Sequence, residues 1–85
     1  IEPAFDIQTW IDYAKAYAES VGLRLESSAV DCWDNPIDAA ADRIYLEWDI
    51  CSRLNRYAAD ETITDVWVWN EADGANSYLI YIGYA

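Results

Sequence analysis

The C-terminal third of the chain repeats its apolar side chains with a period of two residues, and this pattern constrains the fold most. Within residues 63–70, valine and tryptophan alternate from Val66 to Trp69, and residues 78–84 form a second run of mainly aromatic and aliphatic residues. A period of two places successive side chains on opposite faces of a β-strand. Asp73-Gly74 between the runs is typical of a turn. The sequence therefore predicts an antiparallel hairpin.

Both faces of this hairpin are apolar or aromatic. The side chains divide as Val66 and Val68 against Trp67 and Trp69 on the first strand, and as Tyr78, Ile80, Ile82 and Tyr84 against Leu79 and Tyr81 on the second. Helices can cover one face, and the other needs loops, a second copy or a partner unless it carries only scattered exposed aromatics. The aromatic residues that we consider for such an interface are Trp67, Trp69, Tyr78, Tyr81 and Tyr84.

Two helices are predicted before the hairpin. Residues 6–21 place apolar side chains at helical spacing, with Asp6 as N-cap and Gly22 as the stop. Residues 23–27 alternate as a short strand, and residues 28–34 are expected to form a loop. A second helix is predicted to begin with Asn35 as N-cap and Pro36 at its first position, and to end near Ala59. Its expected core stripe is Ile37, Ala40, Ile44, Trp48, Cys51, Leu54 and Ala58.

These elements predict a single small α+β domain over residues 1–85. The order is α-β-α-β-β, with an antiparallel sheet whose C-terminal hairpin packs against the two helices. A chain of this length buries only about 60–65% of its unfolded surface. A hydrophobic content of 54%, with 15% aromatic residues, is sufficient for a core and argues against disorder.

The charge is the feature that bears most on function. The chain has sixteen acidic and five basic residues, so the formal net charge is -11. Like charges on one small body oppose folding, and solubility needs a magnitude of only about 2–8. We therefore expect a partner with a strongly basic surface, and no direct binding of nucleic acid or membrane. No run of 18 apolar residues is present either.

The predicted second helix arranges part of this acid as a ridge. At 100° per residue Asp38, Asp42 and Asp49 fall on one side of the helix, opposite its core stripe. Asp31 and Asp34 extend the negative zone into the preceding loop. A row of fixed carboxylates resembles phosphates to a protein that binds nucleic acid. A second acidic group consists of Asp60, Glu61, Asp65, Glu71 and Asp73.

Catalysis, cofactors and a built metal site are not expected. The chain has no histidine for general base chemistry and only three glycines, too few for a phosphate-binding loop. Asp31, Asp34, Asp38 and Asp42 lack the spacing of a calcium loop, so only weak divalent binding is expected from them. Cys32 and Cys51 are expected to be reduced thiols, with a disulfide between them as the alternative.

In size, charge and lack of catalytic motifs the chain resembles small acidic phage-encoded inhibitors, among them anti-CRISPR proteins and DNA-mimicking anti-restriction proteins. The resemblance covers the whole chain loosely and rests on composition and on the ridge. It implies that Asp31, Asp34, Asp38, Asp42 and Asp49 occupy the basic groove of a defence nucleoprotein in the cytoplasm of an infected or host bacterial cell.

Two other functions stay open. The immunity proteins of nuclease toxins are also small and acidic, and they block a basic cleft. An assembly module that uses the aromatic hairpin, including a homodimer, is the third interpretation. In that case the acid serves solubility alone.

Overall fold

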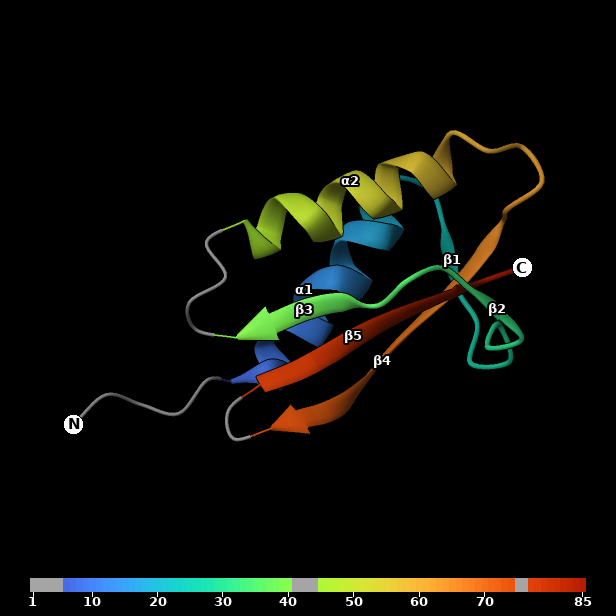
Figure 1. Cartoon of the computed structure of the whole chain (residues 1–85). Coiled ribbons are helices and arrows are strands. Elements are labelled where there is room, and N and C mark those ends of the chain that lie inside the picture. The colour runs from blue at the N-terminus through green and yellow to red at the C-terminus, as the bar shows by residue number, and fades with distance from the viewer. Residues whose placement is uncertain (1–5, 41–44, 75–76) are drawn as a thin grey trace.

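The computed structural model describes residues 6–40, 45–74 and 77–85. In this part of the chain two helices lie against a five-stranded mixed sheet (Figure 1), which confirms the α+β class. The elements are α1 (Ile7–Ser20), β1 (Arg24–Leu25), β2 (Cys32–Trp33), β3 (Ile37–Ala40), α2 (Leu46–Ala58), β4 (Asp65–Gly74) and β5 (Ser77–Tyr84).

The predicted hairpin of β4 and β5 forms the centre of the sheet. The two strands pair antiparallel from Val66 opposite Tyr84 to Gly74 opposite Ser77. β2 and β3 pair antiparallel with β5, and β1 pairs with β4. The β1–β4 pair is parallel. Parallel strands need a long crossover connection, and here the connection contains β2, β3 and α2. The sheet is therefore mixed, whereas an antiparallel sheet was expected from the sequence.

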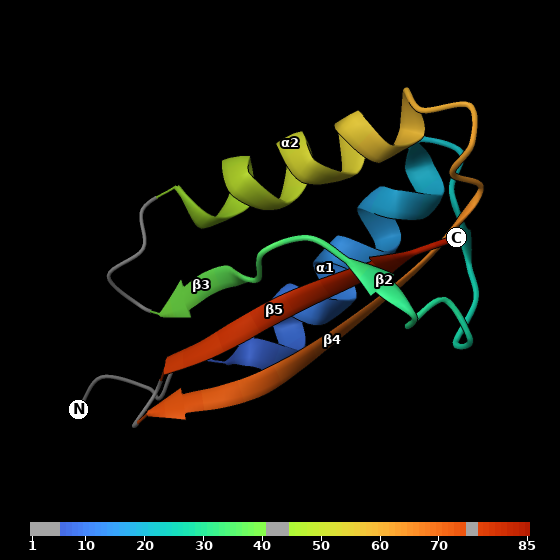
Figure 2. The ribbon, with the colours of Figure 1, turned by 45° about the vertical axis from the view of Figure 1, so that its right-hand side comes forward.

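Both helices cover the same face of the sheet (Figure 2). The valines of β4 and the isoleucines of β5 point toward them, so the alternation predicted for the hairpin is confirmed. The core shared by these elements contains Ile11, Ala14, Ala18, Leu46, Ile50, Leu54, Tyr57, Val66, Val68, Ile80 and Ile82. Neither described helix is long and apolar enough to cross a membrane.

The first helix begins and ends where its sequence predicts. The Asp6 carboxylate accepts hydrogen bonds from the backbone N–H groups of Gln8 and Thr9, which otherwise have no partner within the helix. Gly22 follows the helix with a φ of 93°, a conformation that glycine adopts without strain. This helix packs against β4 and α2.

The start of the second helix was predicted wrongly. Residues after Pro36 form β3, and α2 begins only at Leu46. Ile37 and Ala39 are buried while Asp38 is exposed, which is the pattern of a strand. The pairing of Ile37 with Ile80 of β5 overrides the local preference of proline for a first helical turn.

The helix stripe is rotated as a consequence. Leu46, Ile50, Leu54 and Tyr57 are buried, whereas Trp48, placed in the core by the prediction, is 68% exposed. Of the other predicted stripe residues, Ile37 and Ala40 lie on β3, Cys51 is half-buried, Ala58 is exposed, and Ile44 lies outside the described residues. Glu47 and Asp49 in the first turn and Arg56 in the last complement the helix dipole.

Candidate functional site

The face of the sheet opposite the helices carries an aromatic groove. Trp67, Trp69 and Tyr81 alternate with the core residues of β4 and β5 and therefore lie on this open face. A shallow groove of about 460 Å³ is lined by Val30, Trp33, Trp67, Trp69, Glu71 and Tyr81. We call these six residues the aromatic groove.

Three rings of the groove hold one another in place. Trp69 and Tyr81 are cross-strand partners whose ring planes differ by 8° and whose centroids are 5.4 Å apart. Trp33 stands at 83° to Trp69 and at 85° to Tyr81, with centroid distances of 6.0 and 6.4 Å. Stacked and edge-to-face rings are both favourable arrangements. The rings therefore form a pre-organised surface, of which Trp33 is 49% exposed.

Gly83 allows the loop that carries Trp33 to approach the sheet. β2 pairs with β5 so that Trp33 lies opposite Gly83. A Cβ atom on Gly83 would lie 2.0 Å from the carbonyl oxygen of Ala29 and 3.0 Å from Cζ3 of Trp69. Only glycine has room here, because real Cβ contacts do not fall below 3.0 Å. The loop is thereby packed directly on the open face.

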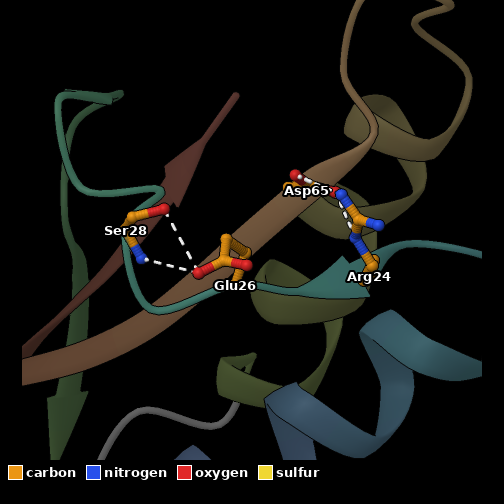
Figure 3. A network of polar contacts seen from close by, with 4 residues as sticks. All are labelled: Arg24, Glu26, Ser28 and Asp65. Atoms are coloured by element: carbon orange, nitrogen blue, oxygen red, sulfur yellow. Dashed lines mark hydrogen bonds and ion pairs between the residues drawn. The ribbon is translucent and has the colours of Figure 1, made fainter.

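Polar contacts fix the beginning of the same loop (Figure 3). The backbone N–H and the hydroxyl of Ser28 both donate to Oε1 of Glu26, at 3.3 and 3.2 Å. Arg24 donates two hydrogen bonds to the carboxylate of Asp65, at 3.0 and 3.1 Å, which joins β1 to β4. The loop between β1 and β2 is therefore anchored by side chains at its start and by β2 pairing at its end.

Negative charge borders the aromatic groove. Glu71 lines it, and Glu71 and Asp73 are both exposed at the end of β4. Desolvation raises the pKa of the Tyr81 hydroxyl, and the neighbouring carboxylates of Glu71 and Asp73 raise it further. At the rim, Nζ of Lys15 lies 4.0 Å from the centroid of the Trp67 ring. The groove thus has the charge and the ring faces that favour a cation.

The predicted ridge is not a row on one helix. Asp38 lies on β3, Asp49 on α2, Asp31 and Asp34 on the chain flanking β2, and Asp42 outside the described residues. Asp38 and Asp49 do line one groove between β3 and α2, but Arg53 and Arg56 line it as well. The helical projection failed because Asp38 belongs to a strand.

Asp34 of the ridge has structural partners. Its Oδ2 atom accepts hydrogen bonds from Arg56 and, at 2.7 Å, from the hydroxyl of Tyr57. Burial raises the pKa of the Tyr57 hydroxyl, and the hydrogen bond to Asp34 raises it further. Arg53 donates to the backbone oxygen of Asn35 at 2.9 Å. The groove between β3 and α2 is therefore of mixed charge, and one of the two arginines that line it, Arg56, is paired with Asp34.

The second acidic group is also divided. Asp60 accepts hydrogen bonds from the N–H and hydroxyl of Thr62, which lower its pKa, and Arg24 lowers the pKa of Asp65. Glu61, like Glu71 and Asp73, is exposed. Among the described residues, Asp34 and Asp65 are the only carboxylates in ion pairs.

Both cysteines are free thiols. Cys32 is exposed on β2, and Cys51 is half-buried on α2, where its sulfur lies 3.1 Å from the hydroxyl of Tyr13. The same hydroxyl donates to Glu47 at 3.1 Å. Within residues 6–40, 45–74 and 77–85 no group of three or more cysteine and carboxylate side chains is placed to hold a metal ion.

The aromatic set predicted from the sequence is only partly together. Trp67, Trp69 and Tyr81 share the open face, whereas Tyr78 and Tyr84 pack against the core on the helix side. Trp33 was missed, because its place depends on pairing with β5, a segment fifty residues later.

Comparison of the chain with protein-family models, curated proteins and solved structures found no match.

Proposed function

We propose that this chain is a non-catalytic acidic inhibitor that binds the basic nucleic-acid-binding surface of another protein. The observation that supports this most is the excess of exposed carboxylates without a cationic partner. Arginine pairs only Asp34 and Asp65 in the described chain, although the net charge is -11. This excess of charge attracts a basic surface whether or not the carboxylates form a row on one helix.

The physical advantage of such a surface is rapid and specific association. Complementary charge accelerates encounter with a basic cleft, and a folded surface loses little entropy when it binds. Carboxylates also accept paired hydrogen bonds from arginine, as phosphates do. We propose a defence nucleoprotein of a bacterial cell as the target, with the inhibitor acting in the cytoplasm.

The test is affinity capture with the immobilised chain from a bacterial lysate, at about 0.05 M and about 0.5 M NaCl. We expect a nucleic-acid-binding protein that is released by duplex DNA and by high salt. The purified captured protein should then lose bound DNA when the free chain is added. A captured protein that keeps its DNA at saturating inhibitor contradicts the proposal.

Three double variants locate the contact, because each removes two negative charges and so changes the net charge equally. They are Asp38→Asn with Asp49→Asn in the β3–α2 groove, Glu71→Gln with Asp73→Asn at the hairpin, and Asp12→Asn with Glu19→Gln on α1. A mimic with a defined contact loses DNA displacement strongly in one pair only. Equal small losses in all three indicate net charge alone and contradict a defined contact.

A second function is favoured by the aromatic groove. An assembly module would use the exposed aromatic rings, and its binding would change little with salt. Self-association of the pure chain, or capture that persists at high salt and in added DNA, supports this function in place of inhibition. An immunity protein shares the physics of the first proposal, and it is distinguished by a captured nuclease toxin.

A further inference from the structure

We infer that the aromatic groove binds an arginine side chain presented by the basic partner, which stacks on a tryptophan or tyrosine ring and pairs with Glu71. Because the occupant belongs to that partner, the inference rests on the proposed function. It adds a defined pocket and a preferred residue to a contact otherwise described by charge alone.

The composition of the groove favours a cation over an apolar occupant. Four of its six residues are aromatic, and aromatic faces attract cations. Glu71 supplies a carboxylate inside the groove, and Asp73 lies close enough to Tyr81 to affect its pKa. Lys15 already places its ammonium group over Trp67 at the rim. The same surface therefore holds a cation within the chain itself.

Arginine fits this arrangement better than lysine. Its guanidinium group is planar, is less strongly hydrated than an ammonium group, and stacks on aromatic rings. The group can also donate two parallel hydrogen bonds to one carboxylate. Ring faces beside Glu71 offer both contacts at once. A lysine ammonium would gain charge attraction but no stacked plane.

A second copy of the chain is a poorer occupant. Two copies that meet through the same face would bring Glu71 and Asp73 of one copy toward those of the other. Each copy also carries a net charge of -11, so their association is opposed at low salt. Charge complementarity thus favours a basic partner.

The five tryptophans of the chain supply the assay. Each gives one indole N–H signal in a nitrogen-15 spectrum, and Trp33, Trp67 and Trp69 report on the groove. Trp48 is an internal control, because it is 68% exposed beside Asp49 but lies on α2. The probes are a capped tri-arginine peptide and a capped tri-lysine peptide of equal charge.

We expect tri-arginine to shift the three groove signals and to leave that of Trp48 in place. Binding should be about two- to fivefold tighter than that of tri-lysine, because only the guanidinium group adds a stacked plane and paired hydrogen bonds to the attraction that both cations feel. Glu71→Gln and Trp33→Phe should each weaken tri-arginine binding several-fold. The matched controls Glu47→Gln and Trp48→Ala, both at exposed positions of α2, should leave it unchanged.

Three results overturn the inference. The first is an equal response of Trp48 and the groove tryptophans, which indicates diffuse attraction. The second is equal affinity for tri-lysine and tri-arginine. The third is movement of the groove signals with protein concentration and no peptide, which assigns the groove to a second copy. If the chain displaces DNA from the captured protein but its groove does not bind tri-arginine, this inference alone is refuted. If the groove binds tri-arginine but the chain displaces no DNA, the inhibitory function alone is refuted.

Discussion

Replacement of Gly83 by alanine tests how the loop before β2 is packed on the sheet. The added Cβ would lie 2.0 Å from the Ala29 carbonyl oxygen, so the backbone must move by about 1 Å to reach the 3.0 Å limit of real contacts. Overpacking of this kind costs about 1–3 kcal/mol. The same change without a clash should stabilise the chain by about 0.4–1 kcal/mol, since Gly83 has no left-handed backbone.

The difference between the two terms is a loss of about 0–2.6 kcal/mol. A clash of about 1 Å with backbone atoms places Gly83→Ala in the upper half of this range, which is a fall in Tm of about 5–21 °C for a domain of this size. Thermal and urea unfolding followed by circular dichroism measure it. Ala72→Gly, at an exposed position of β4, is the matched control and should cost about 0.5–1 kcal/mol from backbone entropy alone. A Gly83→Ala chain that is as stable as the parent, or more so, refutes the described packing of Ala29 on Gly83.

The remaining predictions concern the core and the charge. Leu54→Ala removes a side chain with no exposed surface and should lower the free energy of unfolding by about 2–5 kcal/mol. Trp48→Ala, at an exposed position of the same helix, should change it by at most about 0.5 kcal/mol. Equal midpoints of urea unfolding for the two variants would show that the buried face of α2 is assigned wrongly. Raising NaCl from about 0.01 M to about 0.2 M should raise Tm, because screening relieves repulsion within a chain of charge -11; a Tm that falls would mean that attractive pairs dominate. Arg24 lowers the pKa of Asp65 below its usual value of 3.8, so this carboxylate adds stability above pH 3.8 that is lost as pH falls through its folded pKa. Asp65→Asn should therefore lose stability at neutral pH and show a shallower decline in acid, and parallel acid profiles would count against the pair.

Local sequence signals were sufficient where they were long and agreed with the tertiary contacts. The hairpin repeats its period over two runs, and α1 has both a cap at Asp6 and a stop at Gly22. Residues 37–40 are too short to decide between periods. Ile37 and Ala40 fit one turn of helix, and Ile37 and Ala39 fit a strand equally well. Pairing with β5 decided for the strand, and no local pattern contains that partner.

The site depended on pairing even more than the fold did. Alternation alone placed Trp67 and Trp69 opposite the valines, but the register of β4 with β5 is needed to bring Tyr81 onto Trp69. Trp33 joins them only because β2 pairs with β5 opposite Gly83. The predicted ridge failed for the same reason, since Asp38 left the helix for a strand. The net charge was readable from the chain, whereas the exposure of side chains such as Trp48 and the positions of groups in space were not.

The acidic surface and the aromatic groove should act at different stages of binding to the proposed basic partner. Association and dissociation rate constants, measured separately, can distinguish the two contributions. Long-range charge mainly accelerates encounter, so neutralising Asp12 and Glu19 should lower the association rate constant and flatten its salt dependence. Short-range stacking holds the complex together, so Trp33→Phe should raise the dissociation rate constant with little change in the salt slope. If Trp33→Phe instead changes only association, the groove does not hold the partner and the charge alone explains binding. If neutralising the acid changes only dissociation, the carboxylates are local contacts and do not steer the partner.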